Sequence, residues 1–219
     1  MRKSIKVFCS CLIAGMFIVI AFGCASQKAA SYNVSLSSVE SPADAKVQFG
    51  ETKIVTFTDE AAAITKYSYE DDFVAITWYV DYRQFNFTLR NKSDHTIKIN
   101  WDDISYVNYN GQTGRVMHSG VKYTDKNNSQ PSTMVPKGAS ISDILLPTDN
   151  VYWVSGQYGG WREKSLIPNT TSKEADIDAL ASSYVGKSMT ILMPIYIENV
   201  QNDYVFKFNI DSYTLPKKK

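Results

Sequence analysis

Phe73-Val74-Ala75-Ile76-Thr77-Trp78-Tyr79-Val80, followed after a short gap by Phe85-Asn86-Phe87-Thr88-Leu89, is the stretch that decides the fold class. Branched or aromatic side chains recur at alternating positions, so that Phe85, Phe87 and Leu89 fall on one face. A period of two is typical of a strand with one buried face. The stretch therefore predicts a β-protein made of short antiparallel strands.

Similar runs continue on both sides of this stretch, separated by Asn, Asp, Gly and Pro. Asn91-Lys92-Ser93-Asp94 has turn chemistry, which predicts a hairpin between residues 85–89 and 97–99. Asn110-Gly111 is a strong turn signal and predicts a second hairpin, between residues 105–109 and 115–118. Further strands are expected at residues 32–36, 53–58, 141–146, 189–197 and 204–213, which gives about eight or nine strands and fits a sandwich.

One segment breaks the β-pattern and predicts a single short helix. Thr171-Ser172-Lys173-Glu174 has the order of a capping box, and Ile177, Leu180, Ala181 and Tyr184 recur at helical spacing before Gly186. We expect this helix to seal one end of the sandwich rather than to bind a partner, because its apolar stripe is short.

The motif Phe85-x-Phe87-x-Leu89-x-Asn91-x-Ser93-x-x-x-Ile97-x-Ile99 resembles the immunoglobulin-like domains of many uncharacterised bacterial lipoproteins, over residues 78–147. The resemblance implies a binding or structural module without catalysis. The expected fold is mainly β, a two-sheet immunoglobulin-like sandwich with one short helix near the C-terminal third.

The N-terminus has the order of a secretory signal, with Arg2, Lys3 and Lys6 before an uncharged apolar run. The run ends in Ala21-Phe22-Gly23-Cys24, which resembles a bacterial lipoprotein signal. That resemblance implies a signal peptide at 1–23, acyl chains on Cys24 and a lipid-anchored protein of the bacterial cell envelope. Ala25 after Cys24 implies the outer membrane by the same resemblance. A plain secretory signal and an uncleaved membrane anchor are the alternatives.

Composition divides the rest of the chain into a flexible tether at 24–50, rich in Ala and Ser, and one β-sandwich domain at 51–219. The chain has 23 basic and 22 acidic residues, and removal of the signal peptide leaves 20 basic residues. Nucleic acid is therefore not an expected partner, since its binding needs clustered basic residues and the cluster Lys217-Lys218-Lys219 lies at the C-terminus. All three cysteines lie at or before Cys24, so the domain must fold without a disulfide.

The candidate contact surface is the stretch from Val151 to Arg162, where aromatic residues and glycines alternate too irregularly for a predicted strand. Exposed Trp and Tyr rings suit the apolar faces of sugars or a protein hot spot. A glycan or an envelope protein is the expected partner, and Arg162 would contact a carboxylate. The alternative is that the larger rings fold back into the core. The predicted contact residues are Tyr152, Trp153, Tyr158, Trp161 and Arg162.

Catalysis is not expected, and neither a metal nor another cofactor is predicted. The two histidines, His95 and His118, are not spaced as local metal ligands. Asp71-Asp72 has the character of a solvated turn. Two alternative functions stay open: a metal-assisted hydrolase of envelope polymers that uses His95 and His118, and a subunit of an envelope assembly that binds its partner by strand addition.

Overall fold

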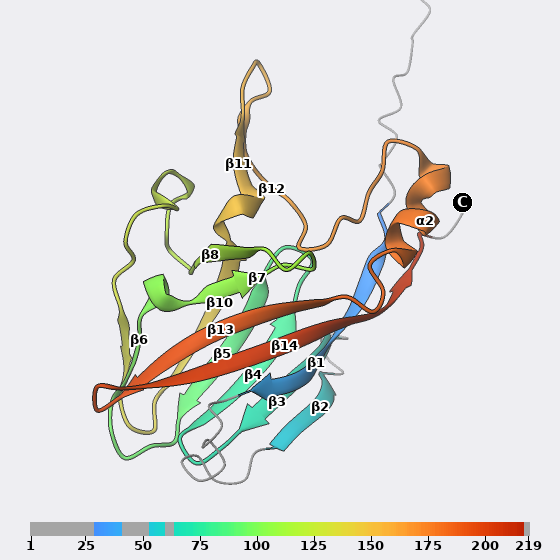
Figure 1. Cartoon of the computed structure of the whole chain (residues 1–219). Coiled ribbons are helices and arrows are strands. Elements are labelled where there is room, and N and C mark those ends of the chain that lie inside the picture. Colours follow the sequence, from blue (N-terminus) through green and yellow to red (C-terminus); the bar gives the residue numbers. More distant parts are fainter. Residues whose placement is uncertain (1–28, 41–52, 60–63, 217–219) are drawn as a thin grey trace, which may run out of the picture.

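The structure is a computed structural model that describes residues 29–40, 53–59 and 64–216. It is mainly β, with one large antiparallel sheet of twelve strands and a separate two-stranded hairpin that projects from it (Figure 1). The strands of the large sheet are β1 (Ser31–Glu40), β2 (Lys53–Asp59), β3 (Ile64–Glu70), β4 (Val74–Val80), β5 (Phe85–Asn91), β6 (Ile97–Ile99), β7 (Ser105–Val107), β8 (Thr113–Met117), β9 (Thr133–Val135), β10 (Ser140–Pro147), β13 (Ser188–Ile197) and β14 (Val200–Thr214). The hairpin consists of β11 (Val151–Val154) and β12 (Gly160–Glu163).

The large sheet is continuous and curls over itself. Its main order is β1-β14-β13-β7-β8-β10-β5-β4-β3-β2, and β6 and β9 extend it beside β13. One half of the sheet contains β1, β14, β13, β7 and β8 with β6 and β9, and the other contains β10, β5, β4, β3 and β2. The two halves are joined where β10 meets β8, because β10 pairs with β5 along most of its length and with β8 at its end. The predicted β-class is confirmed, but the strands expected in two sheets are hydrogen-bonded into one.

Aromatic rings fill the space between the two halves. The Trp78 ring of β4 lies 4.9 Å from that of Phe206 and 5.5 Å from that of Phe208, both on β14. The Phe85 ring of β5 lies 5.1 Å from Phe208. All four side chains are fully buried, as the alternation along each strand predicts. The inward faces of β4, β5 and β14 therefore form one aromatic core.

Asp71, in the turn between β3 and β4, is buried instead of solvated. Its Oδ1 accepts the main-chain N–H groups of Phe73 and Val74, each at 2.8 Å. Its Oδ2 accepts the hydroxyls of Tyr69 at 3.0 Å and Tyr204 at 2.9 Å. Burial, with the Asp71 charge as a further cause, raises the pKa of both tyrosines. The expectation of a solvated turn is wrong for Asp71, because folding brings four donors to its carboxylate.

The hairpin predicted between residues 85–89 and 97–99 does not form. β5 pairs with β4 and β10, whereas β6 pairs with β13 and β9. Asn91 directs the chain away from β5, since its buried Nδ2 donates to the main-chain oxygens of His95 at 2.7 Å and Val135 at 2.9 Å. The turn chemistry is present, but it carries the chain from one half of the sheet to the other.

The second predicted hairpin is confirmed. β7 pairs with β8 around Asn110-Gly111, and Gly111 has a left-handed φ of 78°. β13 and β14 form a long hairpin whose turn residues Glu198 and Asn199 also have positive φ. β3 and β9 were not predicted from the sequence. β9 has only three residues, and β3, although it has seven, carries polar residues at Thr65, Lys66 and Ser68.

β1 lies within the range that composition assigns to the tether. It pairs with β14 from Ser31 to Glu40, and Leu36 is part of the main core. The sheet therefore begins at Ser31, before the expected boundary at residue 51. Cys24, the signal peptide predicted at 1–23 and the C-terminal lysines lie outside the described residues. Within the described parts, no helix is both long enough and apolar enough to span a membrane.

The single α-helix of the described residues, α2 (Ile177–Ser182), lies where the sequence places it, near the C-terminal third. It is preceded by the 3-10 turn η4 (Glu174–Asp176), and its N-cap makes no side-chain hydrogen bond, so the predicted capping box does not start it. Ile177 and Ala181 pack against Ala30 in a small cluster of their own. The helix thus covers the end of the ribbon formed by β1 and β14 (Figure 1).

The aromatic core gives a first testable prediction. Replacing Trp78 with Ala removes the ring that contacts both Phe206 and Phe208 and should lower the free energy of unfolding by about 3–5 kcal/mol. Tyr158→Ala is a matched control, because this ring is 84% exposed; it should change stability by no more than about 0.5 kcal/mol. Urea unfolding followed by tryptophan fluorescence and circular dichroism measures both. Equal effects of the two variants would contradict the assigned core.

Candidate functional site

The stretch predicted to be an irregular loop is a regular hairpin. Antiparallel pairing sets Tyr152 opposite Arg162 and Trp153 opposite Trp161. Side chains of paired residues share a face, so one face of the hairpin carries two tryptophans and the other carries Tyr152 and Arg162. The two tryptophan rings meet edge to face, with centroids 5.6 Å apart. Figure 1 shows that this hairpin stands clear of the large sheet.

Exposure differs between the predicted contact residues. Tyr158 is 84% exposed and Trp153 is 58% exposed, whereas Trp161 is only partly exposed. Trp161 packs against the small buried cluster of Met117, Leu146 and Val151. Of the large rings, Trp161 therefore folds back, and those of Trp153 and Tyr158 face solvent. We define the hairpin surface as Tyr152, Trp153, Tyr158, Trp161 and Arg162.

The tip of the hairpin is held by backbone contacts that need glycine. A Cβ on Gly159 would lie 2.6 Å from the main-chain oxygen of Val154 and 2.9 Å from that of Gly156, and Gly156 itself has a φ of 113°. The Arg162 guanidinium donates to the main-chain oxygens of Trp161 and Tyr158, each at 3.0 Å. The glycines thus make a tight turn, and Arg162 braces it while remaining exposed.

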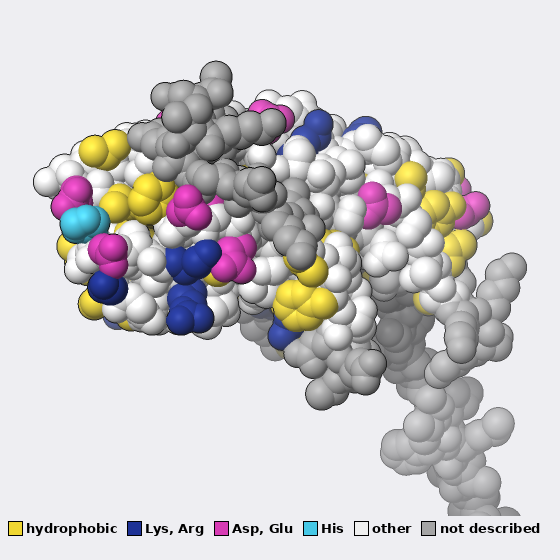
Figure 2. Space-filling view, turned by 90° about the horizontal axis from the view of Figure 1, so that it is seen from below, with side chains coloured by type: hydrophobic (Ala, Val, Ile, Leu, Met, Phe, Trp, Pro, Cys, Tyr) yellow, Lys and Arg dark blue, Asp and Glu magenta, His cyan; other side chains and the backbone are white. Residues whose placement is uncertain are grey.

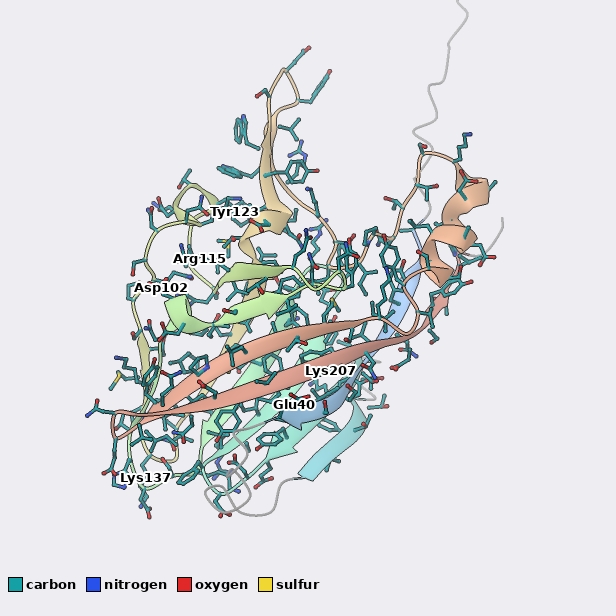
Figure 3. All side chains as sticks on the ribbon, viewed as in Figure 1. Glu40, Asp102, Arg115, Tyr123, Lys137 and Lys207 are labelled. Atoms are coloured by element: carbon teal, nitrogen blue, oxygen red, sulfur yellow. The ribbon has the colours of Figure 1, made fainter. Side chains whose placement is uncertain are left out.

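Polar side chains from two other segments fix the base of the hairpin. Lys126 Nζ donates to the main-chain oxygens of Thr148, at 2.7 Å, and Val151. The Glu163 carboxylate accepts the Tyr123 hydroxyl and pairs with Arg83 at 3.2 Å. The hydrogen bond to Glu163 is the main cause of a raised pKa for Tyr123. Figure 3 places Tyr123 at the foot of β11 and β12.

Asp102 holds the loop that carries Tyr123 and Lys126. It lies in η1 (Trp101–Asp103), and its carboxylate accepts the Ser129 hydroxyl, the Gln130 main-chain N–H and Arg115 Nη2, the last at 2.8 Å. These contacts, the Ser129 hydrogen bond first, lower the pKa of Asp102. Asp102 and Arg115 lie side by side below Tyr123 (Figure 3). Asp102 therefore fixes the loop, and Tyr123 and Lys126 of that loop fix the base of the hairpin.

A groove of about 880 Å³ lies beside the base of the hairpin. Four segments of the chain line it: the turn between β4 and β5, the β7–β8 hairpin, the residues from η3 (Thr148–Asn150) into β11, and residues 163–170. Main-chain hydrogen bonds fix residues 163–170, with Lys164 N–H donating to Asn150 O and Leu166 N–H to Tyr82 O, both at 2.8 Å. Tyr152 belongs to both the hairpin surface and the groove.

No sequence signal predicts this groove, because its walls come from segments that are far apart in the chain. Tyr82, Asn150 and Lys164 line it, and each lies in an ordinary turn or loop sequence. Only the exposed Tyr152, in the aromatic stretch, links it to a predicted contact residue.

The two histidines have separate surroundings. His95 Nδ1 lies 2.8 Å from Glu198, at an exposed turn. The His118 ring stacks on Trp101 at 4.2 Å, and its Nδ1 lies 3.3 Å from Asp143. Ser119 gives Asp143 only its main-chain N–H, at 2.8 Å. Among the described residues no group of three or more His, Cys, Asp or Glu side chains could hold a metal ion.

The end of the molecule opposite the hairpin carries both signs of charge. Lys92 pairs with Glu70 at 2.7 Å, and Lys137 pairs with Asp94 at 2.5 Å. Figure 2, which views this end, shows basic and acidic side chains next to one another. The described surface here has no field of a single sign of the kind that attracts a polyanion.

Comparisons with known proteins give no family for this chain: no protein-family model, no curated protein and no solved structure matches it.

The Asp102 contacts predict a pH-dependent stability. Asp102→Asn removes the ion pair with Arg115 and should lower Tm at pH 7 by about 2–4 °C, the shift expected for a loss of ~1 kcal/mol in a protein of this size. Because the folded-state pKa of Asp102 is lowered, its stabilisation is present above the unfolded pKa of about 3.9 and is lost as the pH falls through the folded value.

Thermal unfolding at pH 7, 5 and 3 measures this difference, which should shrink at pH 3. Asp72→Asn changes an exposed carboxylate for which the structure records no ion pair within its described residues, and should leave Tm unchanged. A parent–Asp102→Asn difference that is the same at all three pH values would contradict the proposed role of the ionised carboxylate.

Proposed function

We propose that this protein is a lipid-anchored binding module of the bacterial cell envelope and that the hairpin surface contacts an envelope polymer. The observation that carries the proposal is a braced hairpin that exposes Trp153 and Tyr158. Aromatic rings are frequent anchors in binding sites because they offer a large contact area and lose little conformational freedom.

The bracing at the hairpin base supports a contact role. An isolated two-stranded hairpin is marginally stable, so this one depends on the contacts of Lys126 and Glu163 at its base to stay ordered. A contact surface that is rigid before binding loses less conformational entropy when its ligand arrives. Exposure of the large Trp153 and Tyr158 rings to water is unfavourable in the free protein, and contact with a ligand would offset that cost.

The envelope address depends on the lipoprotein-type signal that ends at Cys24. An N-terminal lipid on Cys24 would hold the module at a membrane, and the signal favours the outer membrane. The immunoglobulin-like arrangement of the two halves of the sheet also belongs to this proposal. It is supported by the aromatic packing of β4 and β5 against β14.

A second candidate function is strand addition by an envelope partner. β2 ends the main strand order of the sheet, and Val55 and Phe57 on it are 39% and 41% exposed. Such an edge can pair with an extended segment of another chain. The hairpin is the stronger candidate, because its exposed rings are larger and its base is fixed by side chains. The hydrolase alternative has less support, since His95 and His118 pair with different carboxylates.

The lipid anchor is tested with Cys24→Ser expressed in a bacterial host. The parent should fractionate with membranes and gain the mass of its acyl chains. The variant should lose both, since the thiol that would carry the lipid is absent. Cys11→Ser is the matched control and should behave as the parent. An unmodified parent that fractionates with soluble proteins would overturn the envelope address.

The hairpin surface is tested by sedimentation of the full chain, purified in detergent, with peptidoglycan sacculi. The double variant Trp153→Ala, Tyr158→Ala should bind at least tenfold more weakly, because it removes both exposed rings. Phe57→Ala removes an exposed ring on β2 and should bind as the parent. Equal retention of the double variant and the parent would overturn the hairpin surface as the contact, and a loss with Phe57→Ala alone would favour the β2 edge.

A further inference from the structure

We propose that the groove beside the hairpin base is a binding site for a neutral oligosaccharide. This inference rests on the proposed binding role and gives it a ligand class. A volume of about 880 Å³ falls in the range of small-molecule sites in proteins. The groove opens next to the hairpin surface, so a polymer chain that contacts the hairpin can place some of its sugar units in the groove.

The aromatic lining fits the apolar faces of sugar rings. Tyr82 is 54% exposed and Tyr152 is 39% exposed, and both line the groove together with Tyr109. Tyr109 is held by an edge-to-face contact with Tyr184 at 4.8 Å. Flat rings with a polar edge match a ligand that has apolar ring faces and hydroxyl groups at its rim.

Several polar groups of the groove are not used by the fold. Asn108 and Gln112 bond to each other within the β7–β8 turn, with Asn108 Nδ2 donating to Gln112 Oε1 at 3.1 Å. In contrast, no hydrogen bond within the described residues engages the side chains of Asp149, Asn150 or Asn169, which also line the groove. The Asp149 carboxylate can accept hydrogen bonds from hydroxyl groups, and the two amides can both donate and accept, as recognition of a sugar requires.

The balance of charge favours a neutral ligand over an acidic one. Arg83 is neutralised by Glu163 inside the groove, and Arg115 pairs with Asp102 at its rim. This leaves one cation, Lys164, and one anion, Asp149, for which the described residues provide no ion pair. Lys164 Nζ instead lies 5.4 Å from the centre of the Tyr152 ring. A polyanion would be repelled by Asp149 and would gain only one free cation.

The walls of the groove are fixed before any ligand arrives. The Tyr32 hydroxyl donates to Pro168 O at 2.7 Å, and the Ala30 N–H donates to Asn169 O at 2.8 Å. With the bonds of Lys164 and Leu166, these contacts tie residues 163–170 to β1 and to the rest of the sheet on both sides. The segment carries Lys164 and Asn169 into the groove, so its fixation presets their positions.

The inference is tested by calorimetric titration of the full chain in detergent with three neutral tetrasaccharides: the N-acetylglucosamine tetramer, cellotetraose and maltotetraose. At least one should bind saturably at one site. The double variant Asp149→Asn, Asn150→Ala should weaken that binding at least tenfold, because it removes groups that the fold does not use. Asn110→Ala, on the same side of the molecule but outside the groove lining, should bind within twofold of the parent.

Thermal unfolding checks that each variant is folded. Absence of saturable binding for all three tetrasaccharides, or equal affinity of the groove variant and the parent, would overturn the inference. Tetragalacturonate should bind more weakly than the neutral ligand, and tighter binding of this acidic tetrasaccharide would overturn the neutral class.

The experiments distinguish failure of the groove inference from failure of the hairpin proposal. Trp153→Ala, Tyr158→Ala should leave the tetrasaccharide affinity within threefold of the parent, because neither residue lines the groove. If this variant keeps its retention on sacculi while the groove binds a tetrasaccharide, the hairpin proposal fails and the groove stands. If it loses retention while no tetrasaccharide binds, only the groove inference fails.

Discussion

The buried carboxylate of Asp71 is the interaction on which the closure of the sheet depends. An ionised carboxylate in the interior is costly unless donors surround it. Two donors come from its own turn, and the Tyr69 hydroxyl comes from the preceding strand. The fourth, the Tyr204 hydroxyl, comes from β14, more than a hundred residues further along the chain. The carboxylate is therefore fully satisfied only when the two halves of the sheet have met.

Closure of the sheet also determines where the candidate site lies. Trp78, Phe206 and Phe208 pack β4 against β14. β10 pairs with β5 and with β8. The chain between β10 and β13 is left outside the large sheet, where it forms the β11–β12 hairpin and the groove wall at residues 163–170. The hairpin depends on its neighbours, because two strands alone bury too little surface to be stable. Lys126, Tyr123 and Arg83 supply that support from other parts of the chain.

The hairpin surface and the groove together suit a ligand longer than either of them. Tyr152 lies in both, and Lys164 connects the groove wall to the Tyr152 ring. The exposed rings at the hairpin offer contact area without directional bonds, whereas the groove offers amides and a carboxylate that read hydroxyl positions. Affinity and selectivity would thus be divided between two neighbouring surfaces. Under the proposed function, a module held at a membrane through a lipid on Cys24 would present both surfaces to a polymer of the envelope.

The sequence by itself determined the β-class, most of the strands, the Asn110-Gly111 turn and the short helix, because these depend on alternation and turn chemistry within a few residues. It also singled out the aromatic stretch around Trp153. It could not show that β5 and β6 belong to different halves of the sheet. That separation depends on hydrogen bonds from Asn91 to His95 in its own turn and to Val135, and the contact with Val135 forms only on folding. Nor could it distinguish Asp71 from a solvated turn residue, because Tyr204 is remote in sequence. The single continuous sheet, the exposure of Trp153 and Tyr158 and the groove were decided by tertiary structure, since each depends on contacts between segments whose spacing along the chain leaves no local pattern.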